Sequence, residues 1–283
     1  MSNLAPRGAG SALSLSWTGH TDRGRVRANN EDSFLCLQFD ARELRLLGKV
    51  GEASLAHSDY VFAVSDGMGG AMAGEFASRI AVEKTARLMP AAYRRAAEGL
   101  AAGHREVLEE LFSEIHRALL VLGAAYEECA GMGATLTLCW ICPGWLHFAH
   151  IGDSRLYYMP ADGSGLRQLT HDHTHVGWLF REGKINEREA RSHPRRTSLQ
   201  KALGAGHQFF DPQTGATDIR PGDRFLLCTD GLIDGLFNES VLRLLANPGP
   251  AEAARLPAER LVRASVDNSG RDNTTALVIE ILP

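Results

Sequence analysis

The chain has 283 residues, of which 44% are hydrophobic and 23% are charged, and its formal net charge is −4. This length allows one large domain or two small ones, and the composition is ordinary for a soluble globular protein. The slight acidic excess disfavours nucleic-acid binding, because nucleic-acid-binding proteins usually carry a basic excess.

The beginning of the chain is small and polar. Residues 1–12 (MSNLAPRGAGSA) lack the apolar region of a signal peptide, and we expect a disordered arm there. Strands are predicted over 13–18 and 34–39, separated by the charged segment 21–32. Residues 40–57 have no clear period, so we expect them to form a surface excursion.

The stretch YVFAVSDGMGGAMAGE, residues 60–75, is the most informative part of the chain. Its apolar start predicts a buried strand over 60–65, and Asp66 follows, with four glycines in the next eight residues. The stretch lacks the lysine of a P-loop, and Met72 replaces the third glycine of the dinucleotide-binding fingerprint. A carboxylate lies beside phosphate only when a cation separates them, so this stretch indicates a metal site.

Helical periodicity follows. One predicted helix begins at Gly74, an alanine-rich connection covers 90–104, and a second, amphipathic helix carries apolar residues from Leu108 to Leu122. The longest apolar stretch, 118–125, is too short to span a bilayer. The five cysteines are an odd number in apolar segments, which favours buried thiols in a reducing compartment. We therefore expect a cytoplasmic protein without membrane contact.

In the second half the period changes to that of strands. Short turns separate predicted strands over 135–142, 146–150 and 155–158, which indicates an antiparallel meander. Residues 171–205 are polar and are expected to form a flap. The remaining elements are expected to be a strand over 224–228, helices over 236–245 and 255–265 with a proline-containing loop at 247–257, and a last strand over 275–281. This pattern predicts an α+β fold of sheets and helices in one domain, residues 13–283.

Acidic residues recur beside the ends of predicted strands and next to turn residues. They are Glu31, Asp32, Asp66, Asp153, Asp230, Asp234 and Asp272. Any one of them could simply stabilise a turn, because Asp-Gly is a common turn pair. If they converge, two charges about 4 Å apart repel by roughly 4 kcal/mol at an effective dielectric constant near 20. Hard divalent cations remove that repulsion and prefer oxygen ligands.

The ordered motifs resemble those of the metal-dependent Ser/Thr protein phosphatases, the PPM or type 2C family, in its bacterial form. The resemblance spans residues 14–282 and rests on TDRGRVRANNED (21–32), FAVSDGMGG (62–70), GMGATL (131–136), IGDSR (151–155), LTHDHT (169–174), LLCTDGL (226–232) and RDNTT (271–275). It implies a central antiparallel β-sandwich flanked by pairs of antiparallel helices, in α-β-β-α layers.

The resemblance also implies roles for the acidic residues. Asp66 would bridge two Mn²⁺ or Mg²⁺ ions, with Glu31 and the Gly67 carbonyl on one of them. Asp230 and Asp272 would bind the other ion.

The remaining members of the set would have supporting roles. Asp32 would hold coordinated water, and Asp153 and Asp234 match the position of a third, weaker ion. Arg27, four residues before Glu31, corresponds to the family's phosphate-binding arginine. Met68 lies where many eukaryotic relatives carry histidine, so no general acid is assigned.

The function expected from these residues is hydrolysis of phosphoserine and phosphothreonine in proteins. Two metal ions can acidify a bridging water, and a bidentate arginine can stabilise charge on the phosphoryl oxygens. The expected partners are phosphorylated proteins and a bacterial Ser/Thr kinase or its targets, and a monomer is expected. A non-catalytic regulator that binds phosphoproteins on the same scaffold is the alternative.

Three further motifs have weaker interpretations. The HDHTH run at 171–175 could form a zinc site if it lay on a strand, although solvent-exposed flap histidines are the simpler interpretation. Cys139 and Cys142 should point to opposite faces of their strand. The basic turn at 193–196 could contact an acidic or phosphorylated partner or simply be solvated.

Overall fold

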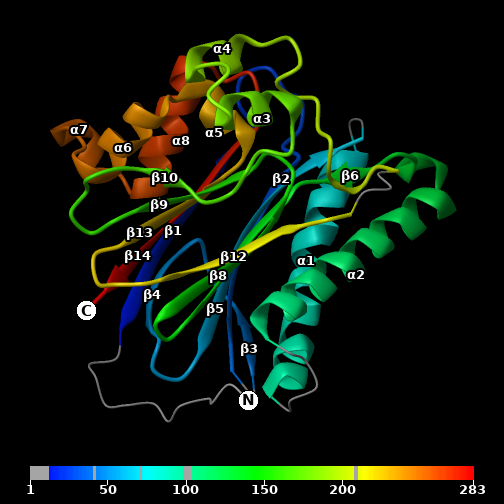
Figure 1. The fold of residues 1–283 in the computed structure, drawn as a ribbon, viewed down its shortest axis with the longest axis horizontal. Coiled ribbons are helices and arrows are strands. Elements are labelled where there is room, and N and C mark those ends of the chain that lie inside the picture. The colour runs from blue at the N-terminus through cyan, green and yellow to red at the C-terminus, as the bar shows by residue number, and fades with distance from the viewer. Residues whose placement is uncertain (1–12, 41–42, 70–71, 98–102, 207–209) are drawn as a thin grey trace.

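Two antiparallel β-sheets packed against each other form the centre of the computed structural model, which describes residues 13–40, 43–69, 72–97, 103–206 and 210–283 (Figure 1). The six-stranded sheet has the order β10 (Arg167–Gln168), β9 (Arg155–Met159), β13 (Arg224–Cys228), β14 (Thr274–Leu282), β1 (Ser14–Asp22) and β4 (Val50–Ser54). The eight-stranded sheet contains β11 (Leu203–Gly204), β6 (Gly133–Ala134), β5 (Asp59–Met68), β7 (Leu136–Cys142), β8 (Trp145–Ile151) and β12 (Gln213–Asp218), with β2 (Asp32–Phe39) on β5 and β3 (Leu44–Leu46) on β2.

Helices cover the outer face of each sheet (Figure 1). On the eight-stranded sheet lie α1 (Ala73–Ala97) and α2 (His104–Ala125), followed by the 3-10 turn η1 (Glu127–Cys129). On the six-stranded sheet lie α5 (Asp230–Gly235), α6 (Asn238–Ala246), α7 (Pro250–Ala253) and α8 (Pro257–Asn268). The flap contains α3 (His175–Arg181) and α4 (Glu187–Ser192).

Three apolar cores separate these four layers. Trp17, Phe62 and Phe225 belong to the core between the sheets. Phe112 of α2 and Trp140 of β7 belong to the core under α1 and α2, and a third core lies under the α5–α8 helices. The apolar run of β5 is buried on both faces because it separates two of these cores. The predicted α+β fold with helical layers outside a β-sandwich is therefore confirmed.

Several element boundaries differ from the sequence predictions. α1 continues through Pro90 to Ala97, because Tyr93 in its last turns packs on Phe39 (5.3 Å between ring centroids) and on Trp140 (6.1 Å). Tertiary packing thus outweighs the hydrogen bond that a proline removes from a helix.

The segments predicted as irregular also contain regular structure. The surface excursion at 40–57 includes the edge strands β3 and β4, whose partners β2 and β1 supply the backbone hydrogen bonds. The loop at 247–257 contains α7, and Pro250 and Pro257 begin α7 and α8, where a missing N–H costs nothing. β12 and α5 were not predicted. The predicted arm at 1–12 lies outside the described residues.

Within the described part of the chain, none of the helices combines the length and the apolar character that crossing a membrane requires.

Candidate functional site

A cavity of about 650 Å³ opens at the end of the sandwich where β2 begins, β5 ends and α5 begins. Its lining includes seven of the residues selected from the sequence: Arg27, Glu31, Asp66, Gly67, Asp153, Asp230 and Asp272. The acidic residues, which are up to 241 positions apart in the chain (31 to 272), therefore converge on one space. The other two predicted residues, Asp32 and Asp234, are not among its lining residues.

The backbone of Asp66 is fixed by Thr135, on the adjoining part of the same sheet. Thr135 N donates to Asp66 O (2.8 Å), and Asp66 N donates to Thr135 Oγ1 (2.9 Å). Ser65 Oγ donates to Thr135 O (2.6 Å), so the same threonine is held from a third side. Burial, followed by repulsion from Asp32 and Asp230, raises the pKa of Asp66 well above its usual range.

Asp32 lies directly opposite Asp66 in the β2–β5 register and is buried. Its Oδ2 accepts hydrogen bonds from Thr275 Oγ1 (2.7 Å) and Thr229 Oγ1 (2.8 Å). Its buried Oδ1 has no hydrogen-bond partner among the described residues. Burial raises the pKa of Asp32 to about 7, although both hydroxyl groups oppose that shift.

Two more carboxylates respond to burial in the same way. Burial, with repulsion from Asp153 and Asp272, raises the pKa of Asp230 well above its usual range. Burial, with repulsion from Asp172, raises the pKa of Asp153 to about 7. Burial thus disfavours the charged form of these four acidic groups, and a cation among them would favour it.

Close backbone packing brings Glu31 next to Gly67. A Cβ at Gly67 would lie 1.9 Å from Gly74 O, and one at Gly74 would lie 2.9 Å from the Glu31 carboxyl carbon. Only glycine at both positions allows the end of β5, the start of α1 and Glu31 to approach so closely. Gly70, the last residue of the FAVSDGMGG motif, lies outside the described residues.

Arg27 is the member of the alternating Arg23, Arg25 and Arg27 series that lines the cavity. Its Nη2 lies 2.7 Å from Asp272 Oδ2, and half of its side chain remains exposed. Arg25 pairs instead with Asp267, and Arg23 donates to Ala28 O. A guanidinium therefore lies at the cavity, beside the carboxylates.

Asn273 organises the loop that carries Arg27 and Glu31. Its Oδ1 accepts from Glu31 N (2.7 Å), and its Nδ2 donates to Asn29 O (2.8 Å) and Arg23 O (2.9 Å). Sequence reasoning assigned no role to Asn273, or to Thr135, Thr229 and Thr275. A signal was present, since each lies in one of the quoted motifs, but their partners are distant in sequence.

The cavity fits a hard divalent cation by the chemistry of its donors. All of the clustered candidate ligands are oxygen atoms, which Mn²⁺ and Mg²⁺ prefer over nitrogen and sulfur. The unpartnered Asp32 Oδ1 adds a buried acceptor that a coordinated water could satisfy.

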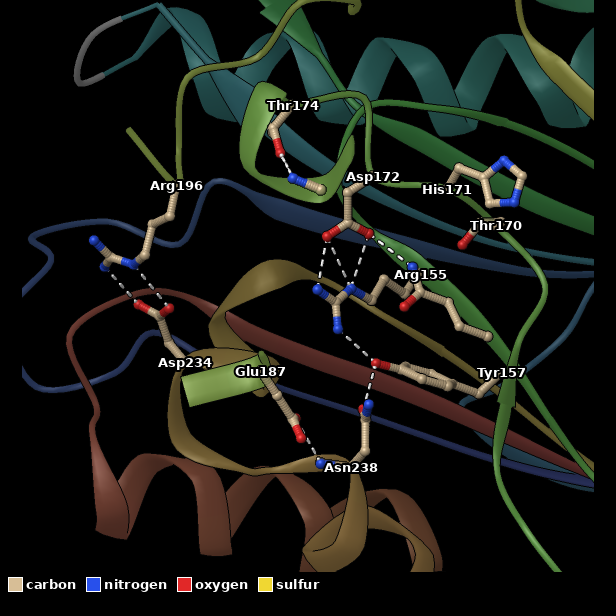
Figure 2. A network of polar contacts seen from close by, with 12 residues as sticks. Arg155, Tyr157, Thr170, His171, Asp172, Thr174, Glu187, Arg196, Asp234 and Asn238 are labelled. Carbon is tan, nitrogen blue, oxygen red and sulfur yellow. Dashed lines mark hydrogen bonds and ion pairs between the residues drawn. The ribbon is translucent and has the colours of Figure 1, made fainter. Parts of the chain in front are cut away.

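Asp234 does not line this cavity. It lines a neighbouring pocket, which shares Asp153, Asp230 and Thr197 with the cavity. There Arg196 pairs with Asp234 (Figure 2), and its Nη2 lies 3.1 Å from Asp234 Oδ2. Part of the basic turn at 193–196 thus folds inward.

The flap is anchored by the network in Figure 2. Arg155 donates to both carboxylate oxygens of Asp172, with the shortest contact at 2.6 Å, and to Tyr157 OH at 2.7 Å. Tyr157 OH donates to Asn238 Oδ1, and Glu187 of α4 accepts from Asn238 N. The buried sheet, the flap and the start of α6 are thereby connected.

The histidines of the HDHTH run do not lie on one strand. His173 precedes α3, its ring stacks on that of His150 at 4.9 Å, and its Nδ1 accepts from Gly152 N. His175 begins α3 and stacks on Trp178. Among the described residues these histidines form no cluster with metal-binding spacing, so the geometry does not favour the zinc hypothesis.

Residues 51–255 match the family model described as Protein phosphatase 2C. The chain is 35% identical over 273 residues to the serine/threonine protein phosphatase PstP of Mycobacterium tuberculosis, an alignment that covers 95% of this chain and 46% of that protein. It therefore spans about half the length of this relative. It is 30% identical over 261 residues to the serine/threonine phosphatase stp of Listeria innocua, with 92% of this chain and 93% of that protein covered.

Solved structures give the same result. The M. tuberculosis phosphatase PstP/Ppp superposes with a TM-score of 0.72 at 32% identity, covering 96% of this chain and 100% of that one. Stp1 from Staphylococcus aureus has a TM-score of 0.77 at 26% identity, covering 99% and 100%. The PstP catalytic domain in complex with 2 manganese ions has a TM-score of 0.71 at 31% identity, covering 96% and 100%.

Proposed function

This chain belongs to the protein phosphatase 2C family, and from that premise we propose that it hydrolyses phosphoserine and phosphothreonine in proteins at a centre of two divalent cations. The observation that carries the proposal is the convergence of an all-oxygen set of candidate ligands and one guanidinium on a single open cavity. Such a cavity can take a phosphate ester only when cations offset the carboxylates.

The residues that would hold the ions are those around Asp66. Asp66 would contact both ions, Glu31 and the Gly67 carbonyl one of them, and Asp230 and Asp272 the other. When bound, the ions supply Lewis-acid charge and acidify the water that attacks phosphorus. The manganese found in the related PstP structure supports Mn²⁺, and the oxygen donors suit Mg²⁺ as well.

The chain's own residues would bind and orient the substrate. Arg27 would donate two N–H groups to the phosphoryl oxygens, because its guanidinium lies at the cavity and half of its side chain is exposed. Asn273 would keep Arg27 in place through the backbone of residues 23, 29 and 31. Thr135 would hold Asp66 in its position on β5.

Asp153 and Asp234 would form a weaker third position. Asp153 lines the main cavity, whereas Asp234 is neutralised by Arg196. A third ion would therefore compete with this arginine for Asp234, which would lower the affinity for an ion at that position.

We also infer the wider setting of the activity. Residues 13–283 would act as one catalytic domain, with the flap at 171–205 beside the cavity. The substrates would be phosphorylated proteins, and the enzyme would oppose a bacterial Ser/Thr kinase as a cytoplasmic monomer.

Hydrolysis of p-nitrophenyl phosphate and of a phosphothreonine peptide would test the proposal, with Mn²⁺, with Mg²⁺ and with a chelator. We expect hydrolysis that requires metal. Arg27→Lys should lose more activity than Arg23→Lys, since only Arg27 of this pair lines the cavity. Stable binding of the phosphopeptide without turnover, by folded and metal-loaded protein, would instead favour the phosphoprotein-binding regulator.

A further inference from the structure

A second cluster of metal-ligating side chains lies at the other end of β7. This strand begins next to Thr135, at the acidic cavity, and ends at Cys142. There His104, Cys142 and His147 each place a ligand atom within 4.8 Å of the other two. The proposed phosphatase reaction uses none of these three residues.

Three elements build the cluster. Cys142 is the last residue of β7, and His147 lies on β8 opposite Trp140, so both side chains are on the face that α2 covers. His104 is the first residue of α2 and packs on Trp140, with ring centroids 4.5 Å apart. The rings of His104 and His147 stack at 3.9 Å with an interplanar angle of 5°.

Burial favours the neutral form of both imidazoles, which is the form that binds metals. Burial lowers the pKa of His104, and burial together with the charge of His104 lowers the pKa of His147 to about 4. Two stacked rings could not both be imidazolium cations without strong repulsion. Neutral imidazole nitrogen is therefore available at physiological pH.

Cys142 supplies a donor that distinguishes this cluster from the acidic cavity. Burial, with repulsion from Asp59, raises the pKa of its thiol to about 12. A bound cation would displace this proton to solvent, leaving the thiolate as its ligand. Two imidazoles and one thiolate form a ligand set that binds zinc more tightly than the hard ions Mg²⁺ and Mn²⁺.

The cluster is accessible to a cation from solvent. All three side chains are partly exposed, and His147 also lines a cavity of about 240 Å³ together with Arg105, Phe148 and Thr214. A fourth ligand could therefore be water.

We propose that His104, Cys142 and His147 form a zinc-binding site, separate from the acidic cavity, with water as the fourth ligand. A metal lies in the plane of an imidazole that binds it, so the stacked rings must separate: His104, at the start of α2, turns about its Cβ–Cγ bond. Bound zinc would then tie the start of α2 to the β7–β8 hairpin. In the structure, the rings of His104 and His147 stack on each other, and His104 packs on Trp140.

Cobalt spectroscopy on the full chain tests this site independently of enzyme activity. Co²⁺ replaces zinc in such sites, and thiolate coordination gives a charge-transfer band that carboxylate ligands cannot produce. With excess Mg²⁺ present, we expect one thiolate-bound Co²⁺ per chain, released when Zn²⁺ is added. The band should be absent in Cys142→Ser and unchanged in Cys129→Ser, the matched control at the other partly buried cysteine.

Thermal unfolding provides a second readout. Zn²⁺ at 100 times its Kd should raise the Tm of the wild type and of Cys129→Ser by about 5–10 °C more than that of Cys142→Ser or His147→Gln. Lack of the cobalt band in folded wild-type protein would overturn the proposal and leave an aromatic stack. A band that persists in Cys142→Ser would also overturn it. Neither result depends on whether the acidic cavity hydrolyses phosphate esters.

Discussion

The two ends of β7 carry opposite kinds of ionisable group, although burial acts on both. At the acidic cavity, burial raises the pKa of Asp66, Asp153 and Asp230. At the other end it lowers the pKa of His104 and His147. Desolvation disfavours the charged form in each case, so acids gain protons and bases lose them. The donor atoms, and not burial, decide which cation each end suits.

The two ends also differ in how their side chains are held. Hydrogen bonds with Thr135 fix the backbone of Asp66, and hydrogen bonds from Thr229 and Thr275 fix the side chain of Asp32. At the histidine end, ring stacking on Trp140 holds the side chains, and one ring must turn before a metal can bind. The acidic end is therefore preorganised, whereas the histidine end is adaptable.

Asp66→Asn should give the largest effect and should act on one end only. If Asp66 is the ligand that both proposed ions share, its loss removes several kcal/mol of charge stabilisation, so we expect kcat for p-nitrophenyl phosphate to fall by about 10³-fold or more. The thiolate–cobalt band at Cys142 should be unchanged. A near-normal rate with Mn²⁺ would refute the assignment of Asp66.

Thr135→Val tests whether preorganisation distinguishes the acidic end. It leaves Asp66 N and Ser154 Oγ without the threonine hydroxyl, which should cost about 1–3 kcal/mol of unfolding free energy. Because Asp66 also becomes less well placed, affinity for Mn²⁺ should fall about 10- to 100-fold.

Thr85→Val is the matched control for this change. Thr85 is also buried, but its hydroxyl donates to Ala81 O inside α1. We expect a similar or smaller loss of stability with unaltered Mn²⁺ affinity. Equal Mn²⁺ affinities in the two variants would show that Thr135 acts on stability alone. Urea unfolding and Mn²⁺ titration of the rate measure the two effects.

Asp32→Asn should reveal the electrostatic cost of the acidic end in metal-free protein. The pKa of Asp32 is raised by burial to about 7, above its value of about 4 in an unfolded chain. Between about pH 4 and pH 7, Asp32 is therefore protonated more fully in the folded state than in the unfolded chain. Its favourable contribution to the unfolding free energy is complete below pH 4 and is lost as pH rises through 7.

Asparagine mimics the protonated form. In chelator, the variant should therefore exceed the wild type in unfolding free energy at pH 8, by on the order of 2 kcal/mol, with a smaller difference at pH 5. With saturating Mn²⁺ this advantage should disappear, because the ion stabilises the carboxylate. An advantage that is independent of pH would contradict the assigned shift.

His147→Gln should show the opposite pH dependence, with the smallest effect. The pKa of His147 is lowered by burial to about 4, so between about pH 6.5 and 4 the unfolded chain binds more protons. Its stabilising contribution is complete above pH 6.5 and is lost as pH falls toward 4. The urea midpoint of the variant should fall less than that of the wild type between pH 7 and pH 5.

His57→Gln, at an exposed histidine, is the control for that experiment and should retain the wild-type pH dependence. If both variants behave like the wild type, the difference in charge state between the two ends of β7 would lose its support.

Much of the fold could be predicted from residue order because local periodicity and strand-end chemistry are short-range properties. The run 60–65 is continuously apolar because β5 is covered on both faces, and the steps from Leu108 to Leu122 follow one face of α2. The failures occurred where pairing with another strand, and not the residues of the segment itself, decides the structure. Edge strands β3, β4 and β12 depend on the neighbouring strand more than on their own residues.

For the candidate site, too, some features could be predicted from the sequence and others could not. Residue order and the family resemblance selected the carboxylates and Arg27, because each lies in a short motif with recognisable spacing. Cys139 and Cys142 were also expected on opposite faces of their strand, and β7 places Cys139 in the core between the sheets, whereas Cys142 meets His104 and His147.

Tertiary structure alone decided which of these groups became neighbours. It placed Asp32 under two threonines 197 and 243 residues away, turned Asp234 toward Arg196, and joined two histidines to Cys142. Hydrogen bonds and pKa shifts depend on distances of a few ångströms and on access to water. Both are set only when chain segments distant in sequence pack together.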